Sequence, residues 1–240
     1  MCENCRNELD GRRDFLKLGV AGVVALGLGG LSRPARAAEG PATTLTPDEA
    51  IAALKSGNER YVNDPQVCTM KLAERRAEVA PHQAPWATVI SCADSRVPPE
   101  LIFGGLGLGE LFVARNAGNL VDTATLGTVE YGAAVLGSPL IVVLAHTSCG
   151  AVEAACDVVT KNATYPGAIG NMIEPILPAA IAAKNEPGDF VTNAAKESAR
   201  RTAGRISASS SLISDLASAG KLKIVAAIYD LGAGTVSYLD

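Results

Sequence analysis

The chain has 240 residues, of which 48% are hydrophobic and 19% are charged. This composition supplies enough apolar side chains for a full core and excludes an intrinsically disordered or collagen-like chain. A formal net charge of −4 leaves no broad basic surface for a phosphate backbone, so a nucleic-acid partner is not expected.

Residues 1–37 have the features of an export signal. Arg12 and Arg13 stand before an apolar, glycine-rich run, Leu18–Leu31, which is shorter than the roughly 20 residues that a membrane-spanning helix needs. The following Ala35-Arg36-Ala37 fits the A-x-A cleavage pattern. The arginine pair resembles a twin-arginine signal, so we expect the export machinery of that pathway as a partner and a periplasmic or otherwise exported protein. A retained membrane anchor is the alternative that the apolar run leaves open.

The rest of the chain is expected to be a linker, residues 38–45, and one domain, residues 46–240. Thr46 is a candidate N-cap with Pro47 at the first helical position, which predicts an amphipathic helix that ends near Asn63. Short apolar, β-branched runs then alternate with helical stretches. The expected strands are residues 87–91, 111–114, 140–145 and 224–229, and the expected helices are residues 122–136, 150–159 and 189–219. This alternation predicts an α/β fold with a central, mostly parallel sheet flanked by helices.

Three candidate metal ligands follow two of these expected strands. Cys92 comes directly after the first strand, and His146 and Cys149 come after the third. Because the carboxyl ends of parallel strands meet at one edge of a sheet, these side chains can converge. Two thiolates and an imidazole suit zinc, and three protein ligands leave a fourth position open, which is typical of a catalytic site. A buried cysteine or a core histidine is the commoner role of each residue alone, but Asp94 and Arg96 stand close to Cys92 as well.

These motifs resemble those of the beta-class carbonic anhydrases. The residues that carry the resemblance are Cys92-x-Asp94-x-Arg96, Leu111–Asn119, Thr128–Tyr131, His146-x-x-Cys149-Gly150 and Ile228-Tyr229-Asp230-x-Gly232. They extend over nearly all of the expected domain. The resemblance implies the beta-carbonic-anhydrase fold, one zinc ion held by Cys92, His146 and Cys149, and reversible hydration of carbon dioxide to bicarbonate by a zinc-bound hydroxide.

The resemblance also implies roles for residues around the metal. Asp94 and Arg96 are the implied catalytic pair, joined by a salt bridge beside the zinc. The implied substrate pocket contains Gln83, Phe112, Ala117, Tyr131 and Gly150. Gln83 and Tyr131 are implied to come from or near a partner subunit, so a homodimer or a higher homo-oligomer is expected.

The charges of the expected metal ligands indicate what the Asp94–Arg96 pair does. Two thiolates cancel the formal charge of zinc, which makes the metal a weaker Lewis acid than one held by neutral imidazoles. Asp94 is therefore expected to accept a hydrogen bond from the nucleophile and to orient it. Arg96, whose fork matches carboxylate geometry, is expected to keep Asp94 from binding the metal itself.

Other functions remain open at the level of the sequence. The same site could hydrolyse carbon disulfide or carbonyl sulfide, or the chain could be a non-catalytic zinc-binding protein. A thiol redox protein needs a reactive pair such as C-x-x-C, which only Cys2 and Cys5 form, upstream of the expected cleavage site. His82 is a candidate proton shuttle, and a disulfide between Cys68 and Cys156 is conceivable in an oxidising compartment.

Overall fold

The computed structural model describes residues 43–64 and 72–240. The expected export signal, most of the expected linker and Cys68 lie outside these residues. Within them, no helix is both long enough and apolar enough to cross a lipid bilayer.

Five strands form a single sheet in the order β2-β1-β3-β4-β5. The strands are β1 (Ala87–Cys92), β2 (Leu111–Asn116), β3 (Leu140–His146), β4 (Lys223–Tyr229) and β5 (Val236–Leu239). The first four run parallel to one another, and β5 runs antiparallel to β4. Every residue of β1 and β3 is buried, which explains their almost continuous apolar sequences. The expected α/β fold with a mostly parallel sheet is confirmed.

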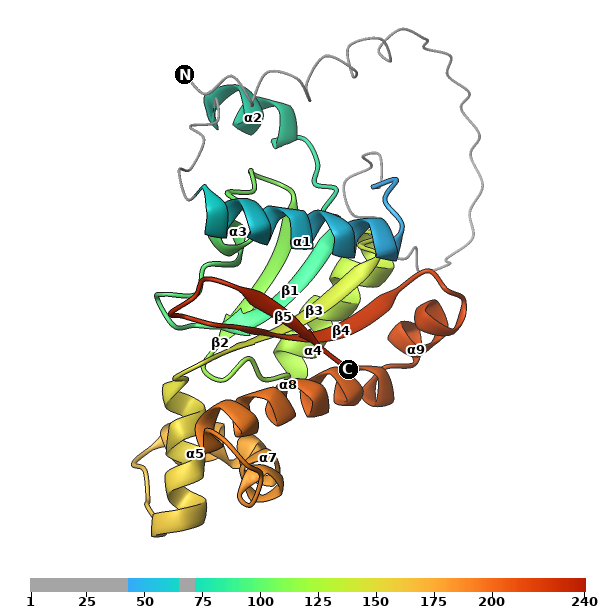
Figure 1. The fold of residues 1–240 in the computed structure, drawn as a ribbon. Helices are drawn as coiled ribbons and strands as arrows, with labels where there is room; N and C mark the ends of the chain where they lie inside the picture. Colours follow the sequence, from blue (N-terminus) through green and yellow to red (C-terminus); the bar gives the residue numbers. More distant parts are fainter. Residues whose placement is uncertain (1–42, 65–71) are drawn as a thin grey trace, which may run out of the picture. The chain divides into compact units, whose positions relative to one another are not determined.

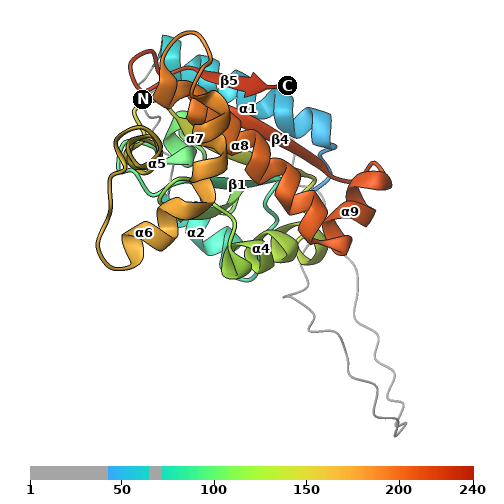
Figure 2. The same cartoon turned by 90° about the horizontal axis from the view of Figure 1, so that it is seen from below.

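Helices cover both faces of this sheet (Figures 1 and 2). The helical elements are α1 (Pro47–Asn63), α2 (Leu72–Val79), α3 (Pro99–Ile102), α4 (Thr123–Glu130), η2 (Tyr131–Val135), α5 (Gly150–Lys161), α6 (Ala168–Ile173), η3 (Glu174–Ile176), α7 (Leu177–Ala183), α8 (Phe190–Ser209) and α9 (Ser211–Ser218). Strand side chains alternate between the faces, so Ile90 and Val143 join the core under α5, α7 and α8. Val89 and Val142 join the core under α1 and α3.

Helix α1 begins where the sequence predicts and is fixed at both ends. The Thr46 hydroxyl accepts a hydrogen bond from the Glu49 N–H, and the Glu49 carboxylate accepts one from the Thr46 N–H, which completes a capping box. Near the other end, the buried Asn58 donates to the carbonyls of Ile102 and Gly234. These bonds tie α1 to α3 and to the turn before β5.

Two expected helices differ in detail from the structure. The helix expected over residues 189–219 is two helices, because the backbone of Ser210 is extended and its hydroxyl accepts from the Ile213 N–H as the N-cap of α9. The helix expected over residues 122–136 begins as α4 and continues into η2, which is a π-helical turn. The sequence does not predict the elements α2, α3, α6, η3, α7 and β5.

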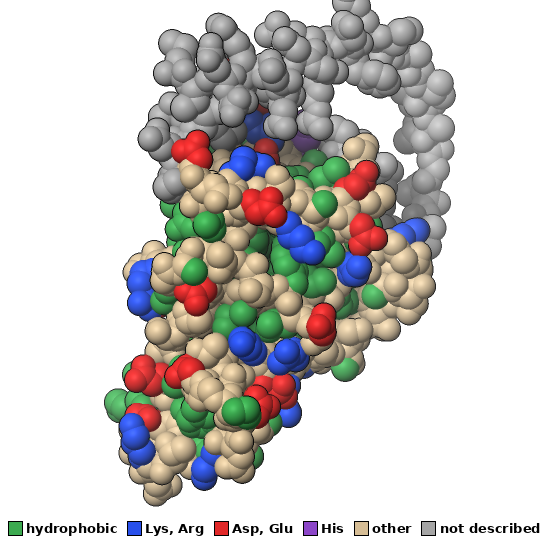
Figure 3. Space-filling model, in the orientation of Figure 1, with side chains coloured by type: hydrophobic (Ala, Val, Ile, Leu, Met, Phe, Trp, Pro, Cys, Tyr) green, Lys and Arg blue, Asp and Glu red, His purple; other side chains and the backbone are tan. Residues whose placement is uncertain are grey.

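Charged side chains of both signs are interspersed over the described face in Figure 3. This distribution accompanies a small net charge and gives that face no single dominant sign.

Candidate metal centre

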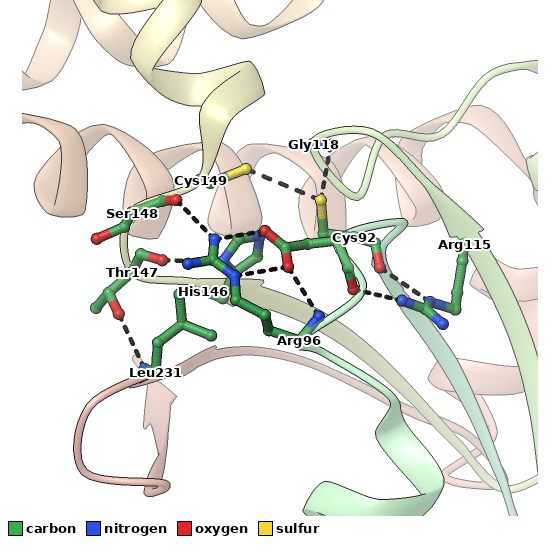
Figure 4. A network of polar contacts seen from close by, with 10 residues as sticks. Cys92, Arg96, Arg115, Gly118, His146, Thr147, Ser148, Cys149 and Leu231 are labelled. Carbon is green, nitrogen blue, oxygen red and sulfur yellow. Dashed lines mark hydrogen bonds and ion pairs between the residues drawn. The ribbon is translucent and has the colours of Figure 1, made fainter.

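Three ligand side chains converge at the carboxyl ends of β1 and β3. Cys92 ends β1, His146 ends β3, and Cys149 is the residue from which α5 begins. The two sulfur atoms are 3.9 Å apart, and the ligand atoms of all three residues lie within 4.8 Å of one another (Figure 4). The parallel pairing of β1 and β3 brings the ends of these strands together. All three side chains are buried, so the donor atoms are shielded from water.

The hydrogen bond of His146 determines which ring nitrogen can bind a metal. Nδ1 lies 2.9 Å from the carbonyl oxygen of Thr147, which can only accept, so Nδ1 carries the proton. Nε2 therefore has a free lone pair. It is fully buried and has no hydrogen-bond partner among the described residues. An unpaired buried nitrogen is unfavourable unless a ligand uses it, and here it faces the two cysteines.

The thiols of Cys92 and Cys149 change each other's pKa. The hydrogen bond from Cys149, with help from the Gly118 N–H, lowers the pKa of Cys92 to about 4. The same shared bond, burial and the nearby charge of Cys92 raise the pKa of Cys149. The two sulfurs share a hydrogen bond, and a divalent cation that binds both of them would displace the proton of that bond. Two sulfurs and one imidazole nitrogen are a donor set that fits zinc.

Asp94 and Arg96 form a tightly bonded pair beside this cluster. Arg96 donates three hydrogen bonds to the carboxylate: from the backbone N–H to Oδ1 at 2.9 Å, from Nε to Oδ1 at 2.9 Å and from Nη2 to Oδ2 at 2.6 Å. These bonds hold the pKa of Asp94 well below its usual range. Oδ2 lies 3.9 Å from Nε2 of His146. The carboxylate therefore remains charged next to the ligand cluster, while the Arg96 side chain, 55% exposed, reaches towards solvent.

Arg115 supports the turn that carries the first ligand, a role that sequence reasoning missed. Its Nε donates to the carbonyl of Cys92 at 3.0 Å, and its Nη2 donates to the carbonyl of Asp94 at 2.6 Å. Arg115 stands in one of the motifs that carry the family resemblance, but nothing in the pattern indicates that its targets are backbone carbonyls on the neighbouring strand. The guanidinium fixes the backbone on both sides of Ala93.

The structure brings together only part of the implied substrate pocket. Ala117 adjoins Gly118, which contacts Cys92, and Gly150 directly follows Cys149, so both lie beside the ligands.

Three implied pocket residues lie elsewhere in the same chain. Phe112 pairs with Thr88, four positions before Cys92, which corresponds to roughly 13 Å along the strand. The ring of Tyr131 packs on Phe112 with 6.1 Å between ring centroids. Gln83 lies exposed in the loop before β1, the same loop that carries His82. A single chain therefore leaves Gln83, Phe112, Tyr131 and the candidate shuttle His82 at the end of β1 opposite the metal ligands.

Cys156 is not part of the ligand cluster. Its thiol is free and buried in α5, and burial raises its pKa to about 11. A thiol with such a pKa is a poor nucleophile at neutral pH, which is typical of a buried structural cysteine. Its conceivable disulfide partner, Cys68, lies outside the described residues.

Comparisons with known proteins agree with this geometry. The sequence profile described as carbonic anhydrase matches residues 87–236. Over 194 residues the chain is 38% identical to carbonic anhydrase 2 of Mycobacterium tuberculosis, and the match covers 81% of this chain and 93% of that protein.

Solved structures show the same fold. A beta-carbonic anhydrase of Coccomyxa, in complex with acetazolamide, superposes with a TM-score of 0.60 at 26% identity, covering 82% of this chain and 87% of that chain. A structure from a study of two tetrameric beta-carbonic anhydrases of Sordaria macrospora superposes with a TM-score of 0.63 at 22% identity, covering 77% of this chain and 90% of that chain. The chain belongs to the beta-class carbonic anhydrase family.

Proposed function

We propose that this protein is a zinc-dependent carbonate dehydratase, a lyase that catalyses the reversible hydration of carbon dioxide to bicarbonate. The observation that carries the proposal is the unpaired, fully buried Nε2 of His146, which faces two thiols within 4.8 Å. Relatives named carbonic anhydrase, among them the Mycobacterium tuberculosis protein, support the same reaction.

Cys92, His146 and Cys149 would hold the metal. A zinc ion held by three protein ligands supplies Lewis acidity, which makes a water molecule nucleophilic near neutral pH. The chain contributes the charge balance and the orientation of the ligands. The carbonyl of Thr147 keeps His146 in the tautomer that presents Nε2, and Arg115 fixes the backbone that carries Cys92.

Asp94 is the group we assign to the reacting water. Its carboxylate stays ionised because Arg96 lowers its pKa, so it can accept a hydrogen bond from water near Nε2. The bidentate contact with Arg96 occupies both carboxylate oxygens and restrains them from binding the metal. The proton released by hydration then passes to solvent or buffer, because a carboxylate with such a low pKa does not retain it.

A second copy of the chain would complete the substrate pocket. β2 is an edge strand of the described sheet, and its apolar residues 111–114 are only half-buried. The ring of Tyr131 packs on Phe112, and Tyr131 and Val135, at the two ends of η2, are 41% and 44% exposed. A two-fold axis that places two β2 strands antiparallel would bring the Phe112 end of one copy to the Asn116 end of the other, next to its metal ligands.

This assembly can be tested with one charged substitution and a matched control. Val135→Glu places a charge on the proposed contact face and should give a monomer with weak activity and a normal zinc content. Ile181→Glu changes an equally apolar residue on α7 that is 62% exposed and should remain oligomeric. Sedimentation of both variants distinguishes the two results. A fully active Val135→Glu monomer would refute a pocket shared between subunits.

Carbonyl sulfide and carbon disulfide are the alternative substrates, since they are linear molecules open to the same nucleophilic attack. A stopped-flow comparison of the three gases on zinc-loaded protein separates the possibilities. We expect hydration of carbon dioxide to be the fastest by far. Preferential turnover of either sulfur compound would replace the proposed substrate, and a protein that holds zinc but turns over none of the gases would be a zinc-binding protein without catalysis.

We further propose that residues 1–37 direct export by the twin-arginine pathway, on the evidence of Arg12, Arg13 and the A-x-A pattern. Replacing both arginines with lysine should leave the precursor in the cytoplasm. Export of that variant at the parental rate would point to another route.

A further inference from the structure

The loop that joins β2 to α4 contacts one of the metal ligands, Cys92. This contact has no part in the hydration chemistry proposed above. The N–H of Gly118 donates to Sγ of Cys92 at 3.4 Å (Figure 4). Gly118 has a φ of +79° and the next residue, Asn119, has a φ of +49°. Glycine adopts the left-handed region freely and asparagine more readily than most residues, but usually as single residues, so two in succession benefit from contacts that fix the loop.

Asn116, the last residue of β2, supplies this support. Its Oδ1 accepts a hydrogen bond from the N–H of Leu120 at 2.7 Å, and its Nδ2 donates to the carbonyl of Leu120, also at 2.7 Å. One carboxamide therefore satisfies both backbone groups of a residue four positions away and closes the loop. Nδ2 also lies 3.3 Å from the hydroxyl of Thr125 on α4.

The backbone of Asn116 joins the same loop to the first ligand strand. Its carbonyl accepts hydrogen bonds from the N–H of Ala93 at 2.9 Å and from the N–H of Asn119 at 3.3 Å. The loop is also confined by packing, since a Cβ placed on Gly118 would lie 2.9 Å from Cδ1 of Ile176. Few positions of the Gly118 N–H are compatible with all of these contacts.

We propose that Asn116 is a positioning residue for the metal centre, and that its carboxamide holds the loop so that the Gly118 N–H donates to the Cys92 sulfur. The inference rests on the proposed zinc site. An N–H···S bond withdraws electron density from the sulfur, so the ligand transfers less charge to the metal. This effect matters here because two thiolates already cancel the formal charge of zinc, and any Lewis acidity that is retained favours the reaction.

Cobalt substitution gives a readout of sulfur donation that does not depend on activity. In Co²⁺-loaded protein, the sulfur-to-metal charge-transfer band reports how easily the thiolates give up electrons. Asn116→Ala removes both bonds to Leu120, so the Gly118 N–H should withdraw from the sulfur and the band should move to longer wavelength. In the zinc-loaded variant we expect kcat to fall by about tenfold, the lower end of the range for groups that support metal ligands.

Two control variants separate this role from a general loss of stability. Thr125→Val removes the third contact of the Asn116 side chain, together with the side-chain bond between Thr125 and Asp122, and should leave the band in place. Ile213→Val trims a fully buried core residue on α9, away from the loop, and should lower stability without moving the band. A band at the parental wavelength in Asn116→Ala, or an equal shift in Ile213→Val, would overturn the positioning role.

A second variant allows the same test if Asn116→Ala folds poorly. Gly118→Ala leaves Asn116 intact but puts a Cβ on a residue with a φ of +79°, 2.9 Å from the Ile176 side chain, so the strained backbone should displace the N–H and move the band in the same direction. An unmoved band would again overturn the proposal. The hydration rate of the parental protein is measured separately. If the parental protein does not hydrate carbon dioxide but the variants shift the band, only the proposed function is refuted. If it hydrates carbon dioxide normally but the variants leave the band unmoved, only the positioning role is refuted.

Discussion

Replacing Arg96 with alanine tests the catalytic pair, because it removes the restraint on Asp94 and leaves the metal ligands untouched. Of the three hydrogen bonds that Arg96 donates to the carboxylate, the two from the side chain are lost and the one from the backbone N–H remains. Asp94 would then be free to rotate towards the ligand cluster.

The distances indicate how small that movement is. Two metal bonds of about 2.1 Å at a tetrahedral angle separate their ligand atoms by about 3.4 Å. Oδ2 of Asp94 lies 3.9 Å from Nε2 of His146, so it needs to approach by only about 0.5 Å to share a zinc ion with that nitrogen. The carboxylate would then occupy the position that the reacting water needs. We expect the hydration rate to fall by at least about 10²-fold, while zinc content stays near one per chain.

Arg201→Ala is the matched control for this experiment. The Arg201 side chain is 51% exposed and pairs with Glu197 at 2.7 Å, whereas that of Arg96 is 55% exposed and pairs with Asp94 at 2.6 Å. Both variants lose one exposed ion pair, so their stabilities should change by similarly small amounts. Stopped-flow hydration and metal analysis of both proteins decide the matter. Parental activity in zinc-loaded Arg96→Ala would show that the restraint on Asp94 is not needed.

Three further predictions concern metal binding, packing and pH. Cys149→Ser should reduce zinc content well below one per chain by metal analysis and lower the melting temperature, because bound metal adds to folding free energy. Gly57→Ala should destabilise the protein in thermal denaturation, since its Cβ would overlap the carbonyl oxygen of Phe103, whereas Gly204→Ala, with open space around it, should stabilise α8 by about 1 kcal/mol. Because the folded-state pKa of Asp94 is lowered, its contribution to stability is present above the usual pKa of about 3.9 and is lost as the pH falls through the lower folded value. The free energy of unfolding should therefore fall more steeply below about pH 4 in the parental protein than in Asp94→Asn, and equal slopes in acid denaturation would contradict this.

The sequence predicts the central strands well because a strand that is buried on both faces of a sheet has a recognisable apolar sequence. β1 and β3 are buried at every residue and appear as continuous apolar runs. β5 has only four residues, each partly or fully exposed, so no such run marks it. The break at Ser210 follows from one hydroxyl that caps α9, and a serine-rich stretch does not indicate which serine does so.

The ligand cluster is predictable because its members lie at the ends of adjacent parallel strands. The contacts that support the ligands cannot be predicted in this way, because they depend on the register between strands and on backbone groups. The bond from Arg115 to the carbonyl of Cys92 requires the pairing of Ser91 with Arg115, and no side-chain pattern records that pairing. Gln83, Phe112 and Tyr131 lie away from the metal ligands in one chain, so only an assembly could bring them there.

The central claim is that zinc held by Cys92, His146 and Cys149 is required for carbon dioxide hydration, and a zinc titration of the purified protein tests it most directly. Metal is removed with a chelator and returned in steps, and the stopped-flow hydration rate is measured against bound zinc at each step. We expect the rate to rise in proportion to bound zinc and to level off at about one ion per chain. A full hydration rate in the metal-free protein, or no rate at full zinc occupancy, would contradict it.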